Sequence, residues 1–589
     1  MPQVLLLQPW IEDFYTTDCR IQPIGLAYLA ASIKTRFPEM EVTLFDCLAG
    51  GKRRTLPWPK EFGYLRPFYG KKDKSATKLF HEYYRFGKSQ EEIQAFLLKQ
   101  NPILIGVSCL FTPYYKQSLD LASLCKDVFP DVPLVMGGNH ATLHPHSLLR
   151  SPESPIHRDK NKLHPNTKNS PCDFVLPGEA ETLLSEFLSK LFERYPALKD
   201  HEPRQKVKVD LKNLKKSFYE SGLPIYSELG PDVIDIGPSP RELQLIPAFT
   251  GLCLEDYHFN NKPMTFLITS RSCPHRCSFC SIHAVFGFRY QTRQPQDVLL
   301  EIQHRYKQGI HHFDFEDDNL TFSKKFFVEL LQGIIALKLP LTFSAMNGIS
   351  YQSLDFEVLS LMKNAGFSSL NLSLVSSDQT VLHFSDRPHT LKKFFEVMEE
   401  AHQLGLSLTV YVILGMPGQT LLEMVATLKL LAAQPCLIGA SPFYYTPGSP
   451  IHKKNALTGH QGITLASKNK DSFLSARLTA MDLETPDFKR IDIYTLFKLC
   501  RVLNYLKQEL DQKTHFNNPD LHIAHPELDA ALDCMSSGSW YAHTPTGPAA
   551  LPFSAQVLNE WQKTPFIIRG QKGKHFYPWH PSNPKDLKT

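Results

Sequence analysis

Residues 270–287 read SRSCPHRCSFCSIHAVFG, which separates Cys273, Cys277 and Cys280 by three and then two residues. Three thiols on so short a loop can surround one small volume. Soft thiolates favour an iron-sulfur centre or zinc over hard cations. A structural zinc site usually has four ligands, and a nearby histidine could supply the fourth. The spacing alone therefore leaves zinc and iron-sulfur open, and it argues against a set of unrelated buried cysteines.

The stretch that follows this loop repeats one unit of strand and helix. A strand at 265–269 runs directly into the cysteine loop, and helices separate it from five further short apolar strands, at 312–315, 341–345, 369–374, 407–414 and 438–441. Six alternating strands predict a partial parallel (β/α)6 barrel, with its chemistry at the carboxyl ends of the strands. The cysteine loop is the first of those ends.

Polar residues and a glycine stand at the carboxyl ends of several barrel strands. They are Glu316, Asp317 and Asp318 after the second strand, Ser373 and Ser376 at the fourth, and Gly415 at the fifth. Carboxylates shielded from water hold a cation well, but acidic residues here could equally cap the next helix. The glycine would let a flat ring approach the backbone, or it could form a plain turn.

The chain ahead of the loop also alternates short apolar strands with helices. This order predicts an α/β, doubly wound, Rossmann-like or flavodoxin-like sheet covered on both faces. Ligands of such sheets lie beyond the carboxyl ends of the strands. The residues at those ends are Gln8, Trp10, Ser108, Cys109, Gly137, Gly138, Asn139, His140, Gly178 and Glu179. A tight turn alone would explain the glycine pair, but four such strand ends together favour a binding edge.

Composition limits the class of protein. The chain has 589 residues, 42% of them hydrophobic, which suffices for several cores. With 64 basic and 59 acidic residues, it has no global field that would favour nucleic acid. It has neither a signal peptide pattern nor a long apolar run, so no membrane segment is expected. The twelve cysteines, three of them in one loop, suit a metal centre in a reducing cytoplasm.

Shifts in composition divide the chain into four expected parts. We expect a ligand-binding domain at 1–196, a connector at 197–261, a barrel domain at 262–455 and a mainly helical region at 456–589. An insertion at 161–171 precedes the last strand of the first domain. The last part has an aromatic tail, for which packing is favoured over capping of the barrel: Trp540, Tyr541, Trp561 and Phe566.

The cysteine spacing, with Phe279 before the last cysteine, resembles the signature of the radical SAM superfamily. The first domain resembles the cobalamin-binding domain that precedes the barrel in one large class of that superfamily. The strings that carry this second resemblance are PIGLAYLA at 23–30, IGVS at 105–108, GGNHAT at 137–142 and PGEAE at 177–181. The Asp-x-His-x-x-Gly string that supplies a histidine to cobalt elsewhere is absent. The resemblance therefore implies cobalamin without a protein histidine on cobalt.

The resemblance implies cofactors and roles for the residues above. Cys273, Cys277 and Cys280 would hold a 4Fe-4S cluster whose fourth iron binds S-adenosylmethionine. The acidic run 316–318 would meet the ammonium group of S-adenosylmethionine, and Gly415 would lie beside its adenine. Val375 stands where the family often has a glutamate for the ribose, which leaves the ribose to the serines at 373 and 376. Cobalamin would bind at the edge of the first sheet.

The implied activity is that of a cobalamin-dependent radical SAM enzyme. The reduced cluster would cleave S-adenosylmethionine to a 5′-deoxyadenosyl radical, the radical would take a hydrogen from an unreactive carbon, and methylcobalamin would donate a methyl group. We therefore expect a C-methyltransferase that acts on a small molecule and draws electrons from a carrier such as flavodoxin or ferredoxin. Nucleic acid and membrane partners are not expected.

Three alternatives compete with this interpretation. The same cofactors could support rearrangement, cyclisation or oxidation without methylation. A methylthiotransferase that acts on tRNA would need a second cluster on three N-terminal cysteines, for which Cys19, Cys47 and Cys109 are available in number. The strand-end settings of the last two argue against that cluster, and no basic RNA-binding module is evident. A non-enzymatic cobalamin or iron-sulfur sensor is the alternative from another class.

Overall fold

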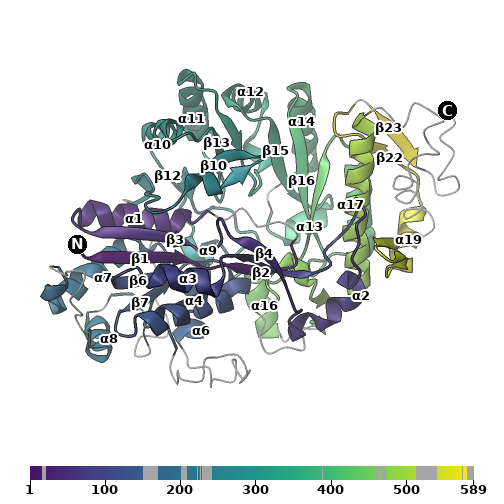
Figure 1. Cartoon of the computed structure of the whole chain (residues 1–589). Helices are drawn as coiled ribbons and strands as arrows, with labels where there is room; N and C mark the ends of the chain where they lie inside the picture. The colour runs from purple at the N-terminus through teal and green to yellow at the C-terminus, as the bar shows by residue number, and fades with distance from the viewer. Residues whose placement is uncertain are drawn as a thin grey trace.

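The computed structural model in Figure 1 places two α/β halves side by side, with a helix-rich region packed against the barrel half. One half is formed by the N-terminal third of the chain, and the other by the partial barrel. The structure describes residues 1–15, 22–149, 170–199, 209–221, 223–225, 227, 242–387, 389–458, 464–465, 473–512, 540–573 and 575–579.

The N-terminal half is built on a five-stranded parallel sheet in the order β3-β1-β6-β7-β8. Counted along the parallel strands, this is the flavodoxin-like order 2-1-3-4-5, whose switch point lies between β1 and β6. The prediction of a doubly wound sheet is confirmed. The strands are β1 (Gln3–Gln8), β3 (Glu41–Asp46), β6 (Pro102–Ser108), β7 (Leu134–Gly137) and β8 (Phe174–Leu176).

Alternate residues of β1 explain why both faces of this sheet are covered. Successive side chains of a strand point to opposite faces. Val4 and Leu6 are buried in one apolar cluster, which α1 and α7 share, and Leu5 and Leu7 in another, which α3 and α4 share. The continuous apolar run of β1 is therefore buried on both sides. These helices are α1 (Ile24–Arg36), α3 (Gln90–Leu97), α4 (Tyr115–Val128) and α7 (Ala180–Arg194).

A second, antiparallel sheet lies beside the carboxyl edge of the first. Its order is β2-β5-β4, and much of it comes from the aromatic-rich stretch after β3, whose shape the sequence did not predict. Its strands are β2 (Ile11–Asp13), β4 (Lys52–Leu56) and β5 (Tyr83–Gly87), and α2 (Arg66–Tyr69) lies between the last two along the chain. Beside it, α5 (Asn139–Leu143) and α6 (Pro145–Leu149) follow β7.

The barrel half has the six parallel strands that the sequence predicts. Two groups, β10-β13-β14 and β15-β16-β17, are joined by single bridges from Phe343 to Phe367 and from Ile349 to Leu372. The strands are β10 (Lys262–Leu267), β13 (His312–Phe315), β14 (Thr342–Ser344), β15 (Ser369–Val375), β16 (Ser407–Leu414) and β17 (Leu437–Pro442). The covering helices are α10 (Pro295–Lys307), α11 (Lys324–Ala336), α12 (Phe356–Ala365), α14 (Leu391–Gln403) and α15 (Leu421–Ala432).

The C-terminal region packs against the barrel. Its long helix α17 (Arg490–Gln512) contacts β17 and α15, and Trp540 and Trp561 are buried in the barrel core. The expectation that these aromatic residues pack is met there, although Tyr541 is exposed. Beside the helices, the region has two hairpins that the sequence did not predict: β20 (Tyr541–Thr544) with β21 (Gly547–Ala550), and β22 (Phe566–Arg569) with β23 (Phe576–Trp579).

The remaining helices and strands are short. They are α8 (Leu211–Glu220), β9 (His258–Phe259), α13 (Gln379–Phe384), α16 (Pro450–Thr458), β18 (Thr464–Leu465), β19 (Leu483–Glu484) and α19 (Ala555–Gln562). Among the residues with a described structure, no helix has both the length and the apolar character needed to cross a bilayer.

Candidate functional site

The three clustered cysteines lie on one loop at the carboxyl end of β10. Two short antiparallel strands, β11 (Ser270–Arg271) and β12 (Gln291–Thr292), close the base of the loop, which also contains α9 (His283–Phe286). Its middle is fixed through Ser278, whose amide donates to the Ser385 carbonyl at 3.0 Å and whose carbonyl accepts from the Ile451 amide at 2.9 Å. Neighbouring parts of the barrel therefore hold this loop in place.

The cysteine side chains are available as thiolate ligands. Cys277 is buried, and Cys273 and Cys280 are half-buried; none is in a disulfide. Burial raises the pKa of the Cys280 thiol to about 11, so an electropositive partner such as iron is needed to hold it as a thiolate at neutral pH. Within the described parts of the chain, no group of three or more His, Cys, Asp or Glu side chains is arranged to hold a single metal ion.

Two donors approach the cysteine sulfurs from other strand ends. Asn319 Nδ2 lies 3.4 Å from Cys273 Sγ, and Arg387 Nη1 lies 3.7 Å from Cys277 Sγ. Arg387 Nη2 also donates to the Ser373 carbonyl at 2.8 Å. Sequence reasoning named neither donor as a site residue, because the asparagine reads as a helix cap and the arginine follows a strand by many residues. A cluster here would receive hydrogen bonds at two of its three thiolates.

The three acidic residues after β13 differ in burial and in hydrogen-bond partners. Asp317 is buried and accepts from the Thr269 amide at 3.1 Å and the Thr269 hydroxyl at 2.7 Å, and also from the Ser270 hydroxyl. Burial raises its pKa to about 6. These bonds orient the end of β10 just before the cysteine loop, and the contact of Asp317 with a cofactor stays a prediction. Glu316 accepts from Asn347 Nδ2 at 2.7 Å, and Asp318 is exposed.

The two serines at the end of β15 also differ in burial. Ser376 is fully buried, and its hydroxyl donates to Glu423 and accepts from the Asp378 amide at 2.9 Å. It therefore ties the strand end to the next helices, and its contact with a ribose stays a prediction. Ser373 remains half-buried. Between them, Val375 has φ +77°, a conformation that is an outlier for a β-branched residue and that tends to occur at functional sites.

Gly415 lies at the end of β16, as the sequence predicts, but the space beside it is filled. Its φ is +84°, and a Cβ there would lie 2.8 Å from Ile493 Cδ1 and 3.3 Å from Phe488. Both contacts come from the C-terminal region. On the Cβ side, the close approach that the glycine permits is therefore made by this chain's own side chains, and the approach of adenine to the backbone here stays a prediction.

At the carboxyl edge of the N-terminal sheet, a pocket lies at the switch point between β1 and β6. Gln8 and Ser108, which end those two strands, line it with Leu48 and residues of the loop after β6. Gln8 is mostly buried, and its amide donates to Asp46 Oδ1 at 3.4 Å. The sequence prediction of a binding edge thus corresponds to a pocket where ligands of this fold class bind.

Trp10 and His140 are buried away from this pocket. The ring of Trp10 packs in the core under Arg85, whose Cζ lies 3.9 Å from the ring centre. His140 is fully buried; Nδ1 lies 3.3 Å from the Thr112 hydroxyl and Nε2 lies 3.0 Å from the Ser147 hydroxyl. Burial lowers the pKa of its imidazole to about 3. The polar atoms of both side chains have partners within the protein, and the contact of either residue with a cofactor stays a prediction.

In the GGNH turn after β7, the backbone conformation and the close packing explain why a glycine is needed. Gly138 has φ +115°, and a Cβ there would lie 2.7 Å from the Cys109 carbonyl oxygen. Gly137 ends β7, and its carbonyl accepts from the Cys109 amide at 2.7 Å. Cys109 is itself fully buried, so it contributes through its backbone rather than its thiol. Asn139, which opens α5, stays half-exposed at this edge.

The residues after β8 meet the barrel. The amide of Gly178 donates to the Thr142 hydroxyl at 2.7 Å. Glu179 lies 3.1 Å from Arg271 Nη1, and Glu181 lies 2.6 Å from Arg271 Nη2. Glu179 therefore forms an ion pair with a residue at the start of the cysteine loop, and its contact with a cofactor stays a prediction. Sequence reasoning missed Arg271, whose only signal was its position two residues before Cys273.

Of the three cysteines considered for a second cluster, the structure describes two, Cys47 and Cys109. Cys47 and Cys109 are fully buried in the core of the N-terminal half, and burial raises the pKa of both thiols. Cys19 lies outside the described residues. The two described thiols therefore pack as apolar core groups.

Comparison with known families matches both halves of the chain. The Radical SAM superfamily model covers residues 267–431, and the B12 binding domain model covers residues 81–154. The first match begins at the last residue of β10 and includes the cysteine loop and the barrel strands from β13 to β16. The second includes β6, β7 and the turn that contains Gly138.

Curated relatives are 21% to 25% identical to the chain over the residues that align. An uncharacterized methyltransferase of Pyrococcus horikoshii is 25% identical over 57% of this chain and 66% of its own length. Cytidylyl-2-hydroxyethylphosphonate methyltransferase of Streptomyces wedmorensis is 24% identical over 72% of this chain and 76% of its own. Anaerobic magnesium-protoporphyrin IX monomethyl ester cyclase of Rubrivivax gelatinosus is 21% identical over 65% of this chain and 63% of its own.

Solved structures share the two-domain arrangement. TsrM from Kitasatospora setae, a radical S-adenosylmethionine methyltransferase with cobalamin and a 4Fe-4S cluster bound, has a TM-score of 0.58 at 15% identity, over 84% of this chain and 91% of its own. OxsB, a cobalamin-dependent S-adenosylmethionine radical enzyme, has a TM-score of 0.54 at 12% identity, over 91% and 70%. At these identities the likeness concerns the fold alone.

Proposed function

The chain belongs to the cobalamin-binding radical SAM family, with a 4Fe-4S cluster, S-adenosylmethionine and cobalamin as its cofactors, and on this premise we propose that it is a C-methyltransferase that acts on an unactivated carbon of a small molecule. The observation that carries the proposal is that the carboxyl edge of the N-terminal sheet, where cobalamin is expected, contacts the barrel end that has the cysteine loop, where the cluster is expected. A Cβ on Gly448, after β17, would lie 2.8 Å from Leu143 of α5 and 3.2 Å from Ala284 of the cysteine loop.

The thiol loop fits the cluster. Cys273, Cys277 and Cys280 are the proposed iron ligands, and the donors Asn319 and Arg387 supply hydrogen bonds to two of the sulfurs. A buried Arg387 Nε with no bonding partner among the described residues leaves a donor for an anionic group. When bound, the reduced cluster cleaves S-adenosylmethionine to a 5′-deoxyadenosyl radical, and methylcobalamin supplies the methyl group.

Fewer residues remain for S-adenosylmethionine than the sequence suggests. Glu316, Asp318 and Ser373 stand at the carboxyl ends of barrel strands: Glu316 and Ser373 are half-buried, and Asp318 is exposed while its carboxylate accepts from the Ser272 amide at 2.8 Å. We propose that the two carboxylates receive the ammonium group and that the backbone around Ser373 and the strained Val375 receives the ribose. Charge-assisted hydrogen bonds of this kind hold a substrate in one orientation.

For cobalamin, we propose the switch-point pocket and the turns beside it. Gln8 and Ser108 line the pocket, while Gly137, Gly138 and Asn139 shape the neighbouring turn. His140 has no free ring nitrogen to offer a metal, since both contact hydroxyls. This supports cobalamin without a lower histidine ligand from this turn.

The C-terminal region is proposed to close the space between the two edges. Phe473 packs on His140 and His144, with ring centres 5.1 and 4.5 Å apart, and Ile493 lies against Gly415 of the barrel. The same stretch of chain therefore covers strand ends of both halves. Such cover excludes water from a reactive centre, and its side chains are placed to select the substrate.

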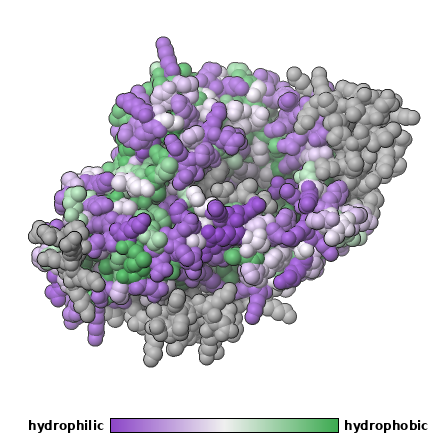
Figure 2. All heavy atoms as spheres, in the orientation of Figure 1, coloured by the Kyte–Doolittle hydropathy of each residue, from purple (hydrophilic) through white to green (hydrophobic). Residues whose placement is uncertain are grey.

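We also propose an intracellular, reducing location and an acidic electron carrier of the flavodoxin or ferredoxin type. The edge strand β4 offers a basic surface to such a partner. Figure 2 shows a strongly hydrophilic patch near the middle of the face drawn, over β4, whose Lys52, Arg53 and Arg54 are exposed. Opposite charges on two proteins speed their encounter.

A second candidate keeps the cofactors and omits methylation. It is favoured by the cyclase among the relatives, which aligns with 65% of this chain. The mass of the product separates the two, because methylation adds one methylene unit to the substrate and rearrangement adds none.

The proposal is tested on protein reconstituted anaerobically with iron, sulfide and cobalamin. We expect cluster absorbance, one bound cobalamin and formation of 5′-deoxyadenosine from S-adenosylmethionine. Cys277→Ala should abolish 5′-deoxyadenosine formation while cobalamin stays bound, because the thiol belongs to the barrel loop and does not line the switch-point pocket. Absence of both cluster absorbance and S-adenosylmethionine cleavage in the wild type would refute the enzyme, and a silent wild type that binds both cofactors would support a sensor.

A further inference from the structure

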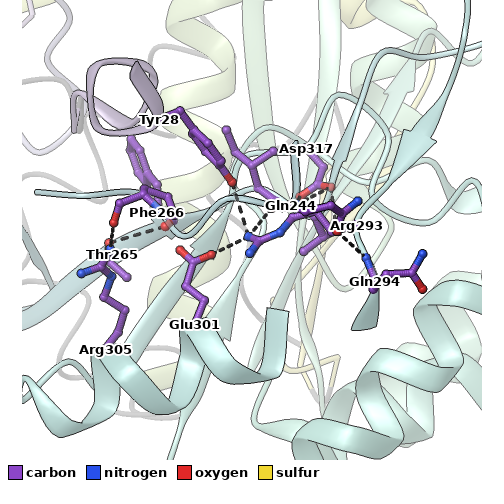
Figure 3. A network of polar contacts seen from close by, with 12 residues as sticks. Tyr28, Gln244, Thr265, Phe266, Arg293, Gln294, Glu301, Arg305 and Asp317 are labelled. Atoms are coloured by element: carbon purple, nitrogen blue, oxygen red, sulfur yellow. Dashed lines mark hydrogen bonds and ion pairs between the residues drawn. The ribbon is translucent and has the colours of Figure 1, made fainter. Parts of the chain in front are cut away.

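The two ends of the cysteine loop are anchored on the N-terminal half. Arg271 precedes Cys273 by two residues, and Arg293 follows β12, so these arginines bracket the loop. Both reach Tyr28 of α1. The Arg271 Cζ lies 5.0 Å from the centre of the Tyr28 ring, and Arg293 Nη1 lies 3.4 Å from the Tyr28 hydroxyl. Figure 3 shows Tyr28 and Arg293 pointing toward each other across this junction.

Arg271 is held by two carboxylates of the N-terminal half. Its Nη1 lies 3.1 Å from Glu179 and its Nη2 lies 2.6 Å from Glu181, at the first turn of α7. The three side chains are only 11%, 8% and 6% exposed. A guanidinium that pairs through two separate nitrogens is fixed in direction as well as in position. The start of the cysteine loop is thereby locked to α7.

Arg293 secures the other end of the loop to the barrel. Its side chain forms a fully buried ion pair with Glu301 of α10. Its amide donates to the Thr269 carbonyl at 2.8 Å, and Nη1 donates to the Ile268 carbonyl at 3.2 Å. Arg293 therefore joins the loop, β10 and α10 with Tyr28, as Figure 3 shows for the labelled Tyr28, Arg293 and Glu301.

Stability alone is a weak reason for this arrangement. Buried ion pairs are often no more stabilising than apolar side chains of the same volume, whereas they do specify one geometry. The enzyme holds a cluster on one half and cobalamin on the other, and a misplacement of about 1 Å between reacting groups can cost about 100-fold in rate. A rigid link is most useful beside the cluster, where Arg271 lies.

We propose that Arg271, held by Glu179 and Glu181, is a positioning residue that fixes the cluster loop relative to the cobalamin-binding sheet. Its two carboxylate partners belong to the PGEAE segment that ends β8, and they thus serve the geometry between cofactors rather than contact with cobalamin. The inference rests on the proposed function, which supplies the two cofactors. It assigns these three residues a role in the spacing of the cofactors.

The test uses full-length protein loaded with cluster and cobalamin. The reduced cluster and cob(II)alamin each carry an unpaired electron, and their magnetic interaction falls steeply with separation. For Arg271→Met and for Glu181→Gln we expect wild-type iron and cobalamin contents and 5′-deoxyadenosine formation close to wild type, because that reaction needs the barrel alone. The interaction seen by electron paramagnetic resonance should change in both variants, and Arg271→Lys should recover it in part.

The matched control is Lys498→Met. Lys498 of α17 pairs with Asp73 at 3.3 Å, with the two side chains 2% and 6% exposed, and this pair also joins distant parts of the chain. It should lower stability while leaving the magnetic interaction unchanged.

The proposal is overturned if Arg271→Met and Glu181→Gln both show the wild-type interaction, or if Lys498→Met alters it equally. Should Arg271→Met fail to take up the cluster, Glu181→Gln, which keeps shape and volume, decides the outcome by the same measurement. A wild type that binds only one of the cofactors would refute the proposed function instead, and that result is distinct from a change confined to the variants.

Discussion

Arg387 should set the reduction potential of the cluster. Its Nη1 lies 3.7 Å from Cys277 Sγ, and Arg387 is half-buried. Reduction adds one negative charge to the cluster. A positive charge about 4 Å away stabilises the reduced state by about 1 kcal/mol in water and by about 4 kcal/mol at an effective dielectric constant of about 20. For a one-electron couple, 59 mV corresponds to a tenfold change in equilibrium constant, so this range is about 40 to 170 mV.

Because the added charge spreads over the whole cluster, we expect the lower part of that range. Arg387→Leu removes the positive charge, which destabilises the reduced state, so the midpoint potential should become more negative by about 40 mV or more. The assay is a redox titration followed by electron paramagnetic resonance, without S-adenosylmethionine and with iron content verified.

Arg276→Gln provides the matched control for this prediction. Arg276 lies in the same loop, but it is exposed and stacks over Phe288 at 4.7 Å. Water and salt screen its charge, so its loss should shift the potential far less. An unchanged midpoint in Arg387→Leu with full iron content would refute the reasoning. Equal shifts in the two variants would show that net charge, rather than position, controls the potential.

Three further predictions concern stability. Arg477→Met should lower the free energy of unfolding in urea by about 3–5 kcal/mol, because it leaves the fully buried Asp13, 3.1 Å from Arg477, without its counter-ion. Adding Asp13→Asn to the same chain should restore part of that stability. If nothing is restored, the pairing argument is contradicted. Gly138→Ala should lower the free energy of unfolding by about 1–3 kcal/mol in the same assay, because φ is +115° and the new Cβ would lie 2.7 Å from the Cys109 carbonyl. An unchanged free energy would show that the turn can relax. Burial raises the pKa of Asp317 to about 6. Between pH of about 4 and about 6, the folded protein therefore keeps a proton that the unfolded chain releases. The free energy of unfolding should fall as pH rises through that window and level off above it. Asp317→Asn should lack this component, and an unchanged pH profile would count against it.

Local patterns in the sequence were sufficient for the fold and for the cluster ligands. The spacing of Cys273, Cys277 and Cys280 is a property of eight consecutive residues. Runs such as Val4 to Leu7 indicate strands buried on both faces, and their alternation with helices fixes a parallel arrangement. The five-stranded parallel sheet and the six-stranded half-barrel followed from these signals, since each depends on neighbours in the chain.

The roles of single polar residues depended on partners far away in the chain. Glu179 and Ser376 both stand at strand ends, but one pairs with Arg271 of the other half and the other is buried against Glu423. His140 is occupied at both nitrogens, and the space beside Gly415 is filled by Ile493. The sequence by itself determined which strand ends come together, because periodicity and spacing are local. Only the tertiary structure decided which of their side chains remain available to a cofactor, because burial and hydrogen bonding depend on residues that the chain brings there from a distance.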